Sequence, residues 1–110
     1  MQKLFIAFLL VFSVSFGATT TTKKSTISVY GNCGMCKKTI ESALKISAIK
    51  GASWNPDSKK LKISYLPSEI SLDSIERRIA AVGYDTEHHR ASDLEYNSLH
   101  KCCKYVRKEK

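Results

Sequence analysis

The sequence predicts a ferredoxin-like α+β fold, an antiparallel sheet with two helices on one face. Short stretches of alternating polar and apolar residues indicate strands, and stretches with apolar residues three and four positions apart indicate helices. They follow one another in the order β-α-β-β-α-β. The chain has 110 residues, of which 43% are hydrophobic and 25% charged, as in one globular domain. This length excludes the larger enzyme folds, such as an α/β barrel of about 250 residues.

The first half of the domain predicts three strands and one helix. Residues 26–29 alternate between polar and apolar side chains, which indicates a short first strand. The loop 31–34 interrupts this pattern, and from Met35 onward the apolar residues follow one face of a helix. Residues 51–54 and 61–65 predict two further strands. An Asn-Pro-Asp-Ser sequence between them is a strong turn signal, so these two strands should pair as a hairpin.

The second half predicts another helix and a fourth strand. Ser71 is a suitable N-cap, and the apolar spacing after it predicts a helix that extends to Val82. Gly83 should end this helix, because a left-handed residue is favoured directly after a helix. Residues 84–88 predict a fourth short strand. The remaining segment, 90–110, is expected to form a short helix or turn with a basic end.

The N-terminus has the layout of a secretory signal peptide. Lys3 precedes an apolar run over 4–12, and small residues close this run. We expect cleavage after Gly17, which makes 1–17 the signal peptide and 18–25 a polar spacer. A run of about ten apolar residues is too short to span a membrane, which needs about 20. We therefore expect an exported protein, periplasmic, in the cell envelope or secreted, without a stable membrane anchor.

Cys33 and Cys36 are two thiols separated by two residues, where the first loop enters the first helix. Thiolates bind soft ions such as Cu(I) and Zn(II) in preference to hard ions. The free N–H groups at a helix start stabilise a thiolate and lower its pKa. A site with only two protein ligands stays open, which favours passing an ion on, since structural zinc sites close with four ligands. The same spacing also occurs in thiol–disulfide enzymes.

The sequence around these cysteines resembles the heavy-metal-associated (HMA) domain. This module occurs in copper chaperones, at the N-termini of metal-transporting ATPases and as the periplasmic mercury-binding protein. The resemblance rests on Gly-Asn-Cys-Gly-Met-Cys-Lys-Lys-Thr-Ile-Glu at 31–41 and on Gly-Tyr-Asp at 83–85, and it covers 26–89. It implies that Cys33 and Cys36 are the two metal ligands.

The same resemblance implies an ion, a partner and a further site residue. The ion would be Cu(I) or Hg(II), with Zn(II) as a third candidate, and Tyr84 would lie near it. The partner would be a metal-transporting membrane protein or another acceptor domain with a Cys pair. One position departs from the common motif, which has Met two residues before the first Cys, where this chain has Gly31. The metal preference of the copper chaperones is therefore not carried over. We expect Met35, between the thiols, to pack in the core beside the site, and the alternative is a thioether ligand.

A second pair, Cys102-Cys103, lies in the extension 90–110. Together with Tyr105 it resembles a C-terminal extension found in a bacterial subgroup of HMA proteins. A helix rises about 1.5 Å per residue, so the extension is long enough to bring this pair back beside the first one. Four cysteines could then form a closed thiolate site, a relay pair or disulfides, and the sequence does not choose among them. Adjacent cysteines do not readily chelate one ion together, so we expect one of the two to serve as a ligand.

The predicted function is an exported soft-metal-binding protein that transfers its ion to a transporter or acceptor. The alternative is a small thiol–disulfide oxidoreductase or a redox-regulated sequestering module. We do not expect an enzyme, because the sequence contains no recognisable catalytic constellation. The net charge is +8, but export argues against nucleic acid as a partner. Imidazole is a common metal ligand, so His88, His89 and His100 are further candidates. We expect His88 to be solvated at the surface, and His100 is the better candidate.

Overall fold

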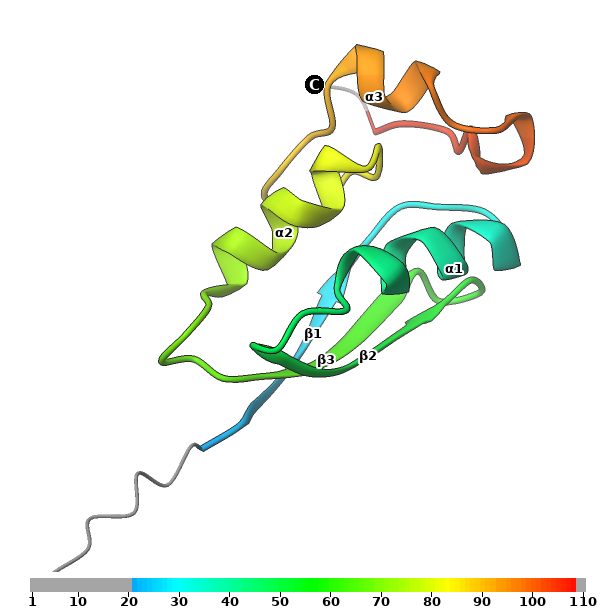
Figure 1. Ribbon diagram of the computed structural model, residues 1–110. Helices are drawn as coiled ribbons and strands as arrows, with labels where there is room; N and C mark the ends of the chain where they lie inside the picture. The colour runs from blue at the N-terminus through cyan, green and yellow to red at the C-terminus, as the bar shows by residue number, and fades with distance from the viewer. Residues whose placement is uncertain (1–20, 109–110) are drawn as a thin grey trace, which may run out of the picture.

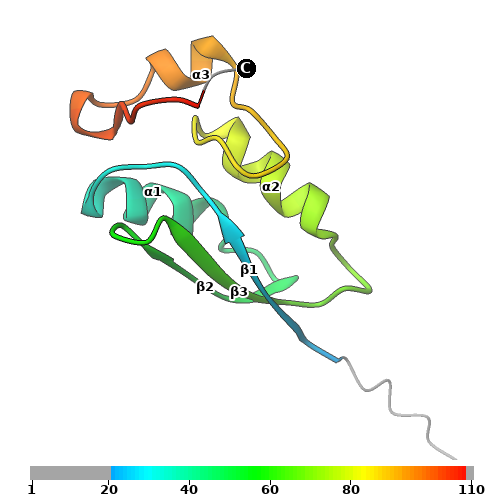
Figure 2. The same cartoon turned by 180° about the vertical axis from the view of Figure 1, so that it is seen from behind.

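The computed structural model describes residues 21–108, which form a three-stranded antiparallel sheet with helices on one face (Figure 1; Figure 2 shows it from behind). The strands are β1 (Lys23–Ser28), β2 (Ile49–Asn55) and β3 (Lys60–Tyr65), and β3 lies in the middle. The helices are α1 (Gly34–Ala43), α2 (Leu72–Ala81) and α3 (Asp93–Asn97), followed by the 3-10 turn η1 (Lys101–Cys103). This arrangement confirms the predicted ferredoxin-like α+β fold.

The core lies between the sheet and the helices, and the predicted periodicities define it. Along β3, Leu61, Ile63 and Tyr65 are buried while Lys60 and Lys62 are exposed. Two helix stripes cover this face, and they consist of Cys36, Ile40 and Leu44 from α1 and Ile75 and Ile79 from α2. Period-two strands and period-3.6 helices therefore meet over one apolar layer.

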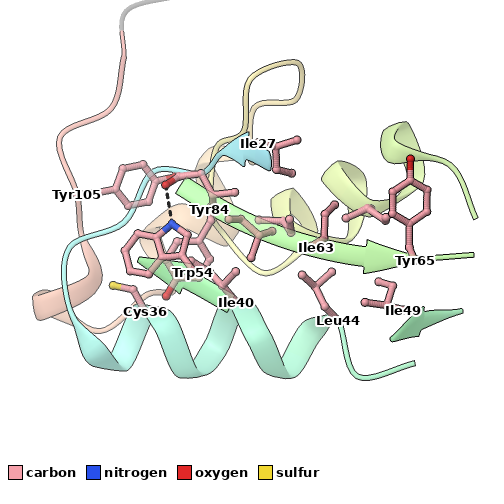
Figure 3. Close-up of a cluster of buried hydrophobic side chains, with 14 of the residues drawn as sticks. Ile27, Cys36, Ile40, Leu44, Ile49, Trp54, Ile63, Tyr65, Tyr84 and Tyr105 are labelled. Carbon is pink, nitrogen blue, oxygen red and sulfur yellow. Dashed lines mark hydrogen bonds between the residues drawn. The ribbon is translucent and has the colours of Figure 1, made fainter. Parts of the chain in front are cut away.

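Trp54 in β2 is buried at the end of the core that adjoins the α1 N-terminus. Its Nε1 donates a hydrogen bond of 2.9 Å to the carbonyl oxygen of Val29. Figure 3 shows that Cys36, Trp54, Tyr84 and Tyr105 gather at this end. Burying an indole N–H costs little free energy when it has a hydrogen-bond partner, so the Trp54 ring can fill this space.

Two strands begin earlier than the sequence predicted. The polar spacer was expected to reach residue 25, but Lys23, Lys24 and Ser25 belong to β1 and pair with the second half of β3. Strand pairing joins backbone groups, so exposed polar side chains do not prevent it. β2 likewise begins at Ile49, with a register irregularity before Gly51. Such a bulge breaks the alternation on which the prediction relied.

The predicted fourth strand over 84–88 is reduced to a single bridge between Val29 and Thr86. The chain turns away at once, because the Thr86 N–H donates to the carbonyl oxygen of His89 at 2.7 Å. On the other side of the bridge, the N–H of Asp85 is taken by a side chain of the C-terminal extension. A tight turn and a competing side chain thus replace the strand ladder.

The predicted signal peptide, 1–17, lies outside the described residues. Within 21–108, no helix is long and apolar enough to cross a membrane.

Candidate metal centre

Cys33 and Cys36 lie at the first turn of α1, where the sequence predicted them. Cys33 is the N-cap residue in an extended conformation, and its carbonyl oxygen accepts the N–H of Lys37 at 3.1 Å. Cys36 is fully buried because it continues the apolar stripe of α1. The two Sγ atoms are 3.8 Å apart. The backbone N–H of Asn32 points at the Cys36 sulfur from 3.4 Å. Loop and helix therefore present both sulfurs to one point.

The helix start favours the thiolate form of Cys33. The backbone N–H groups of Cys36 and, after it, of Met35 lower the Cys33 pKa to about 7. These are the free N–H groups of the first helical turn, which carry partial positive charge. The Cys33 side chain is half-buried, so this sulfur remains accessible. Near neutral pH it is therefore a ready ligand or nucleophile.

Gly31, which departs from the HMA motif, lies against the Trp54 ring. A Cβ atom built at this position would lie 2.9 Å from Trp54 Cη2 and 3.3 Å from Cys36 Cβ. A methionine side chain at this position would meet the indole. The residue that departs from the motif and the tryptophan thus belong to one packing arrangement beneath the metal loop.

The C-terminal extension brings Cys103 to the first pair. The Sγ atoms of Cys33, Cys36 and Cys103 all lie within 4.8 Å of one another. Within residues 21–108 this is the only group of three or more Cys, His, Asp or Glu side chains with such geometry. Figure 1 shows η1 lying over the start of α1. The predicted return of the extension to the CxxC loop thus agrees with the structure.

The two adjacent cysteines have different surroundings. Cys103 is 1% exposed, and burial raises its pKa to about 12. Cys102 is exposed, and its carbonyl oxygen accepts from Asn32 Nδ2 at 3.4 Å. It also accepts a weaker contact from the Cys33 thiol at 3.6 Å. All four cysteines are free thiols in the structure.

Tyr105 anchors the extension in the core. Its hydroxyl donates to the carbonyl oxygen of Gly83 at 2.8 Å and accepts the N–H of Asp85 at 2.8 Å. Its ring stacks on Tyr84 with centroids 5.9 Å apart, and the edge of Tyr96 meets it at 5.1 Å. Gly83 ends α2 as predicted, with φ +103°, a conformation that favours glycine. The end of α2 and the extension are thereby fixed to each other.

Arg107 is part of this anchor, whereas the sequence indicated only a basic end to this segment. Its guanidinium forms a bidentate ion pair with Asp85, at 2.9 and 2.7 Å, and only 11% of its side chain is exposed. Burial opposes ionisation of Asp85, but the Arg107 hydrogen bonds outweigh it and lower the Asp85 pKa. Burial alternates along this segment, because Cys103, Tyr105 and Arg107 face inward while Lys104 and Val106 are exposed. The residue types give no signal of this alternation, since the covered Arg107 is charged and the exposed Val106 is apolar.

Met35 is not in the core, contrary to expectation. It is 47% exposed, and its Sδ lies 3.6 Å from the exposed Cys102 thiol. The core face of α1 repeats every three to four residues from Cys36, and Met35 falls one position off that face. Its thioether is therefore near the site but on the surface.

Tyr84 lies beside the thiol cluster, as the HMA resemblance implied. It is fully buried, and its hydroxyl has no hydrogen-bond partner among the residues that the structure describes. Burial, and next the neighbouring Cys103 and Cys36 groups, raise its pKa well above the usual range. The buried Tyr84 hydroxyl therefore lies beside the sulfurs and donates no hydrogen bond to any of the described residues.

The histidines do not join the cluster. His88 is exposed and its ring bonds to the buried Glu76 at 2.9 Å, which raises the His88 pKa. His89 pairs with Asp73 at 2.6 Å. His100 precedes η1 as its N-cap residue and is not among the grouped ligand atoms. The sequence made His100 the better ligand candidate among the histidines, and the geometry does not bring it to the cluster.

Fold and site define the class of protein: the chain has the fold of heavy-metal-associated domains, with a cysteine cluster at the loop before α1. No protein-family model matches the sequence, and no curated protein matches it.

Several solved structures are similar. CopZ metallochaperone matches with a TM-score of 0.56 at 29% identity, over 58% of this chain and 98% of that chain. The N-terminal domain of a potential copper-translocating P-type ATPase from Bacillus subtilis, in its Cu(I)-loaded state, is also similar. Its TM-score is 0.58 at 25% identity, and the match covers 66% of this chain and 94% of that chain. Oxidized MerP from Ralstonia metallidurans CH34 has a TM-score of 0.57 at 20% identity, and the match covers 61% of this chain and 96% of that chain. At this identity the likeness supports the fold alone. These neighbours are metallochaperones and metal-binding domains, which agrees with a non-enzymatic protein.

Proposed function

We propose that this protein is an exported carrier of a soft metal ion. It binds Cu(I) or Hg(II), with Zn(II) as a third candidate, through the thiolates of Cys33 and Cys36. The observation that carries this proposal is the pair of sulfurs 3.8 Å apart at the start of α1, with the Cys33 pKa lowered to about 7. Soft ions prefer thiolate ligands, and a thiol that ionises near neutral pH binds them with little cost of deprotonation.

The position of the site at the surface allows the bound ion to pass to a partner protein. Cys33 is half-buried and its sulfur is open to a partner, whereas Cys36 is buried. A thiolate of an acceptor can add to the ion beside Cys33 before the Cys33–metal bond breaks. The ion is then never released to water. A metal-transporting membrane protein or another domain with a Cys pair supplies such a thiolate, and the P-type ATPase domain among the similar structures supports this class of partner.

Export is the second part of the proposal, and it rests on the N-terminal sequence. Lys3, the apolar run 4–12 and the small residues that follow are the features of a cleavable signal. Expression in a bacterial host followed by cell fractionation and N-terminal sequencing tests it. The expected product lies in the periplasm or medium and begins at Ala18. A full-length product in the cytoplasm would contradict export without touching the metal proposal.

Titration of the reduced protein tests metal binding. Cu(I), Hg(II) and Zn(II) are each titrated against wild type, Cys33→Ser and Cys36→Ser, with a competing chromophoric ligand to report affinity. We expect one ion per chain in wild type and loss of tight binding in both variants. Mg(II), a hard ion, serves as the negative control. An unaltered affinity in both variants would sink the proposal.

A thiol–disulfide oxidoreductase is the second candidate, and the same two observations favour it. A thiolate of lowered pKa close to a second thiol is also the arrangement of a redox pair. An insulin-reduction assay on the metal-free protein separates the two functions. Turnover of disulfide substrate together with failure to bind any soft ion would favour the redox function.

A further inference from the structure

We propose that Cys103 is a third thiolate ligand, so that the carrier holds its ion in a three-sulfur site closed by the C-terminal extension. This inference rests on the proposed metal-binding function. It replaces the open two-thiolate site expected from the CxxC motif with a site in which the extension takes part.

The sulfur positions fit three ligands better than two. With metal–sulfur bonds of about 2.3 Å, two ligands on opposite sides of an ion hold their sulfurs about 4.6 Å apart, and three in a plane hold them about 4 Å apart. Cys33 and Cys36 are already at 3.8 Å, and Cys103 lies within 4.8 Å of both. Small side-chain rotations bring all three sulfurs around one ion.

The third sulfur is held in place by the fold. Cys103 is 1% exposed, and Tyr105 and Arg107 follow it with their side chains on the same inward-facing side. Tyr105 bonds to the end of α2, and Arg107 to Asp85. Binding therefore needs little ordering of the extension, and pre-organised ligands raise affinity.

The surroundings suit an anionic complex. Three thiolates around Cu(I) or Hg(II) carry a net negative charge. The segments 29–40 and 96–108 contain no carboxylate but six lysine or arginine residues, of which Lys37 and Arg107 are paired with Glu41 and Asp85. The N-terminus of α1 adds partial positive charge. The buried Tyr84 hydroxyl, without a partner among residues 21–108, faces the cluster as a ready donor to a thiolate.

Ion binding also overcomes the cost of ionising a buried thiol. The Cys103 sulfur–hydrogen bond breaks, the proton goes to water, and a sulfur–metal bond forms. A coordinating thiol is deprotonated outright by the ion's own charge. The raised pKa of the metal-free thiol therefore does not prevent ligation.

Cys102 is the matched control for Cys103. It is adjacent in sequence and has the same chemistry, but it is exposed, and its sulfur contacts Met35 on the surface. Under this inference, removal of Cys102 leaves the coordination number unchanged.

The experiment counts sulfur ligands and measures affinity. Reduced full-length wild type, Cys103→Ser, Cys102→Ser and Met35→Leu are each loaded with one equivalent of Cu(I). X-ray absorption gives the number of sulfur atoms around the ion, and competition with a chromophoric chelator gives the affinity. We expect three sulfurs in wild type, Cys102→Ser and Met35→Leu. Cys103→Ser should retain two sulfurs and lose about tenfold or more in affinity, since even groups outside the coordination shell alter metal affinity on that scale.

Each outcome separates this inference from the proposed function. Two sulfurs in wild type, with equal affinity in Cys103→Ser, would overturn the third ligand while leaving the CxxC carrier intact. Loss of a sulfur in Cys102→Ser or Met35→Leu instead would overturn it in favour of the surface group. Failure of wild type to bind Cu(I) would overturn both. Because Cys103 is buried, circular dichroism checks the fold and Cys103→Ala is a second variant, while the sulfur count of wild type needs no substitution.

Discussion

Gly31 leaves room for the Trp54 indole, which fills the space that a side chain at position 31 would occupy. The ring bonds to Val29 and lies against Gly31, so it supports the loop that carries Cys33. The departure from the HMA motif at this residue is thus compensated by an aromatic residue on β2. A single glycine and a single tryptophan, 23 residues apart in the sequence, have to be understood together.

This pairing predicts the effect of substitutions at Gly31. Gly31→Ala and Gly31→Met, which restores the motif residue, should destabilise the protein by about 1–3 kcal/mol, the usual cost of overpacking a core. Urea unfolding measures the change. Gly34→Ala is the control, because a Cβ there has no neighbour within 4 Å, and it should shift the free energy of unfolding by less than about 0.5 kcal/mol. Equal effects at both positions would contradict this packing.

The two thiols that belong to different environments should react differently. In the metal-free protein, alkylation of Cys33 by iodoacetamide should reach half its maximal rate near pH 7, because its pKa is lowered to about 7 and the thiolate is the reactive form. Cys103, buried and with a pKa of about 12, should stay unmodified over the same range. Peptide mass spectrometry at a series of pH values measures both. Early modification of Cys103 would mean that the extension does not cover the site.

At the scale of elements, the extension acts as a strap from α2 to the start of α1. The bond from Tyr105 to Gly83 and the Arg107–Asp85 ion pair hold it at one end, and the contacts of Cys102 with the metal loop hold it at the other. The Tyr105 hydroxyl also accepts the Asp85 N–H, a backbone group of the predicted fourth strand. The position of the extension and the loss of the predicted fourth strand therefore have a common structural cause.

Breaking the ion pair should release the strap. Arg107→Met leaves Asp85 as a buried charge and should cost about 3 kcal/mol, the scale measured when one partner of a buried pair is removed. Cys103 should then become open to alkylation. Arg90→Ala is the control, because Arg90 is 3.9 Å from the same carboxylate and more exposed, and it should cost less than about 1 kcal/mol. Denaturant unfolding and thiol labelling measure the two effects.

The pH dependence of this pair has a definite sign. The folded-state pKa of Asp85 is lowered, so its contribution to stability is complete above the unfolded value of about 4 and is lost as pH falls through the lower folded value. The difference in unfolding free energy between wild type and Arg107→Met should therefore be constant at neutral pH and shrink in acid below about pH 4. A difference that persists in acid would place the effect of Arg107 in packing rather than in charge.

For the whole molecule, the described domain is small, and the cluster joins three segments of it. The sulfurs come from the loop before α1, from α1 itself and from η1, so one bound ion links the N-terminal and C-terminal parts of the fold. A ligand that binds only the folded state stabilises it by mass action.

Stability should therefore depend on soft metal. An ion present at about a hundred times its dissociation constant adds about 2.7 kcal/mol to the free energy of unfolding. For a domain of this size each kcal/mol raises Tm by roughly 4–8 °C. Calorimetry of the reduced protein with and without Cu(I) measures the shift, which Cys33→Ser should abolish and Mg(II) should not produce. An equal shift in the variant would locate the stabilising ion elsewhere.

The sequence by itself determined the fold class, the end of α2 at Gly83 and the CxxC pair at a helix start. These are local properties: side-chain period, a glycine after a helix and the spacing of two thiols depend on neighbours in the chain. The return of the extension could also be anticipated from its length. The sequence could not say which of the two adjacent cysteines faces the site. Neighbouring residues of a helical turn point in different directions, and contacts with other segments decide which one is covered.

Only the tertiary structure decided that Cys103 is buried and Cys102 exposed. It also decided that Arg107 holds the extension to Asp85. The choice depends on Asp85 and Gly83, which are about 20 residues away and offer the partners that fix the register of the extension. The same holds for Met35 on the surface, for Trp54 beneath Gly31 and for a fourth strand reduced to one bridge. In each case the free energy comes from contacts between segments distant in sequence, and local pattern carries no information about those contacts.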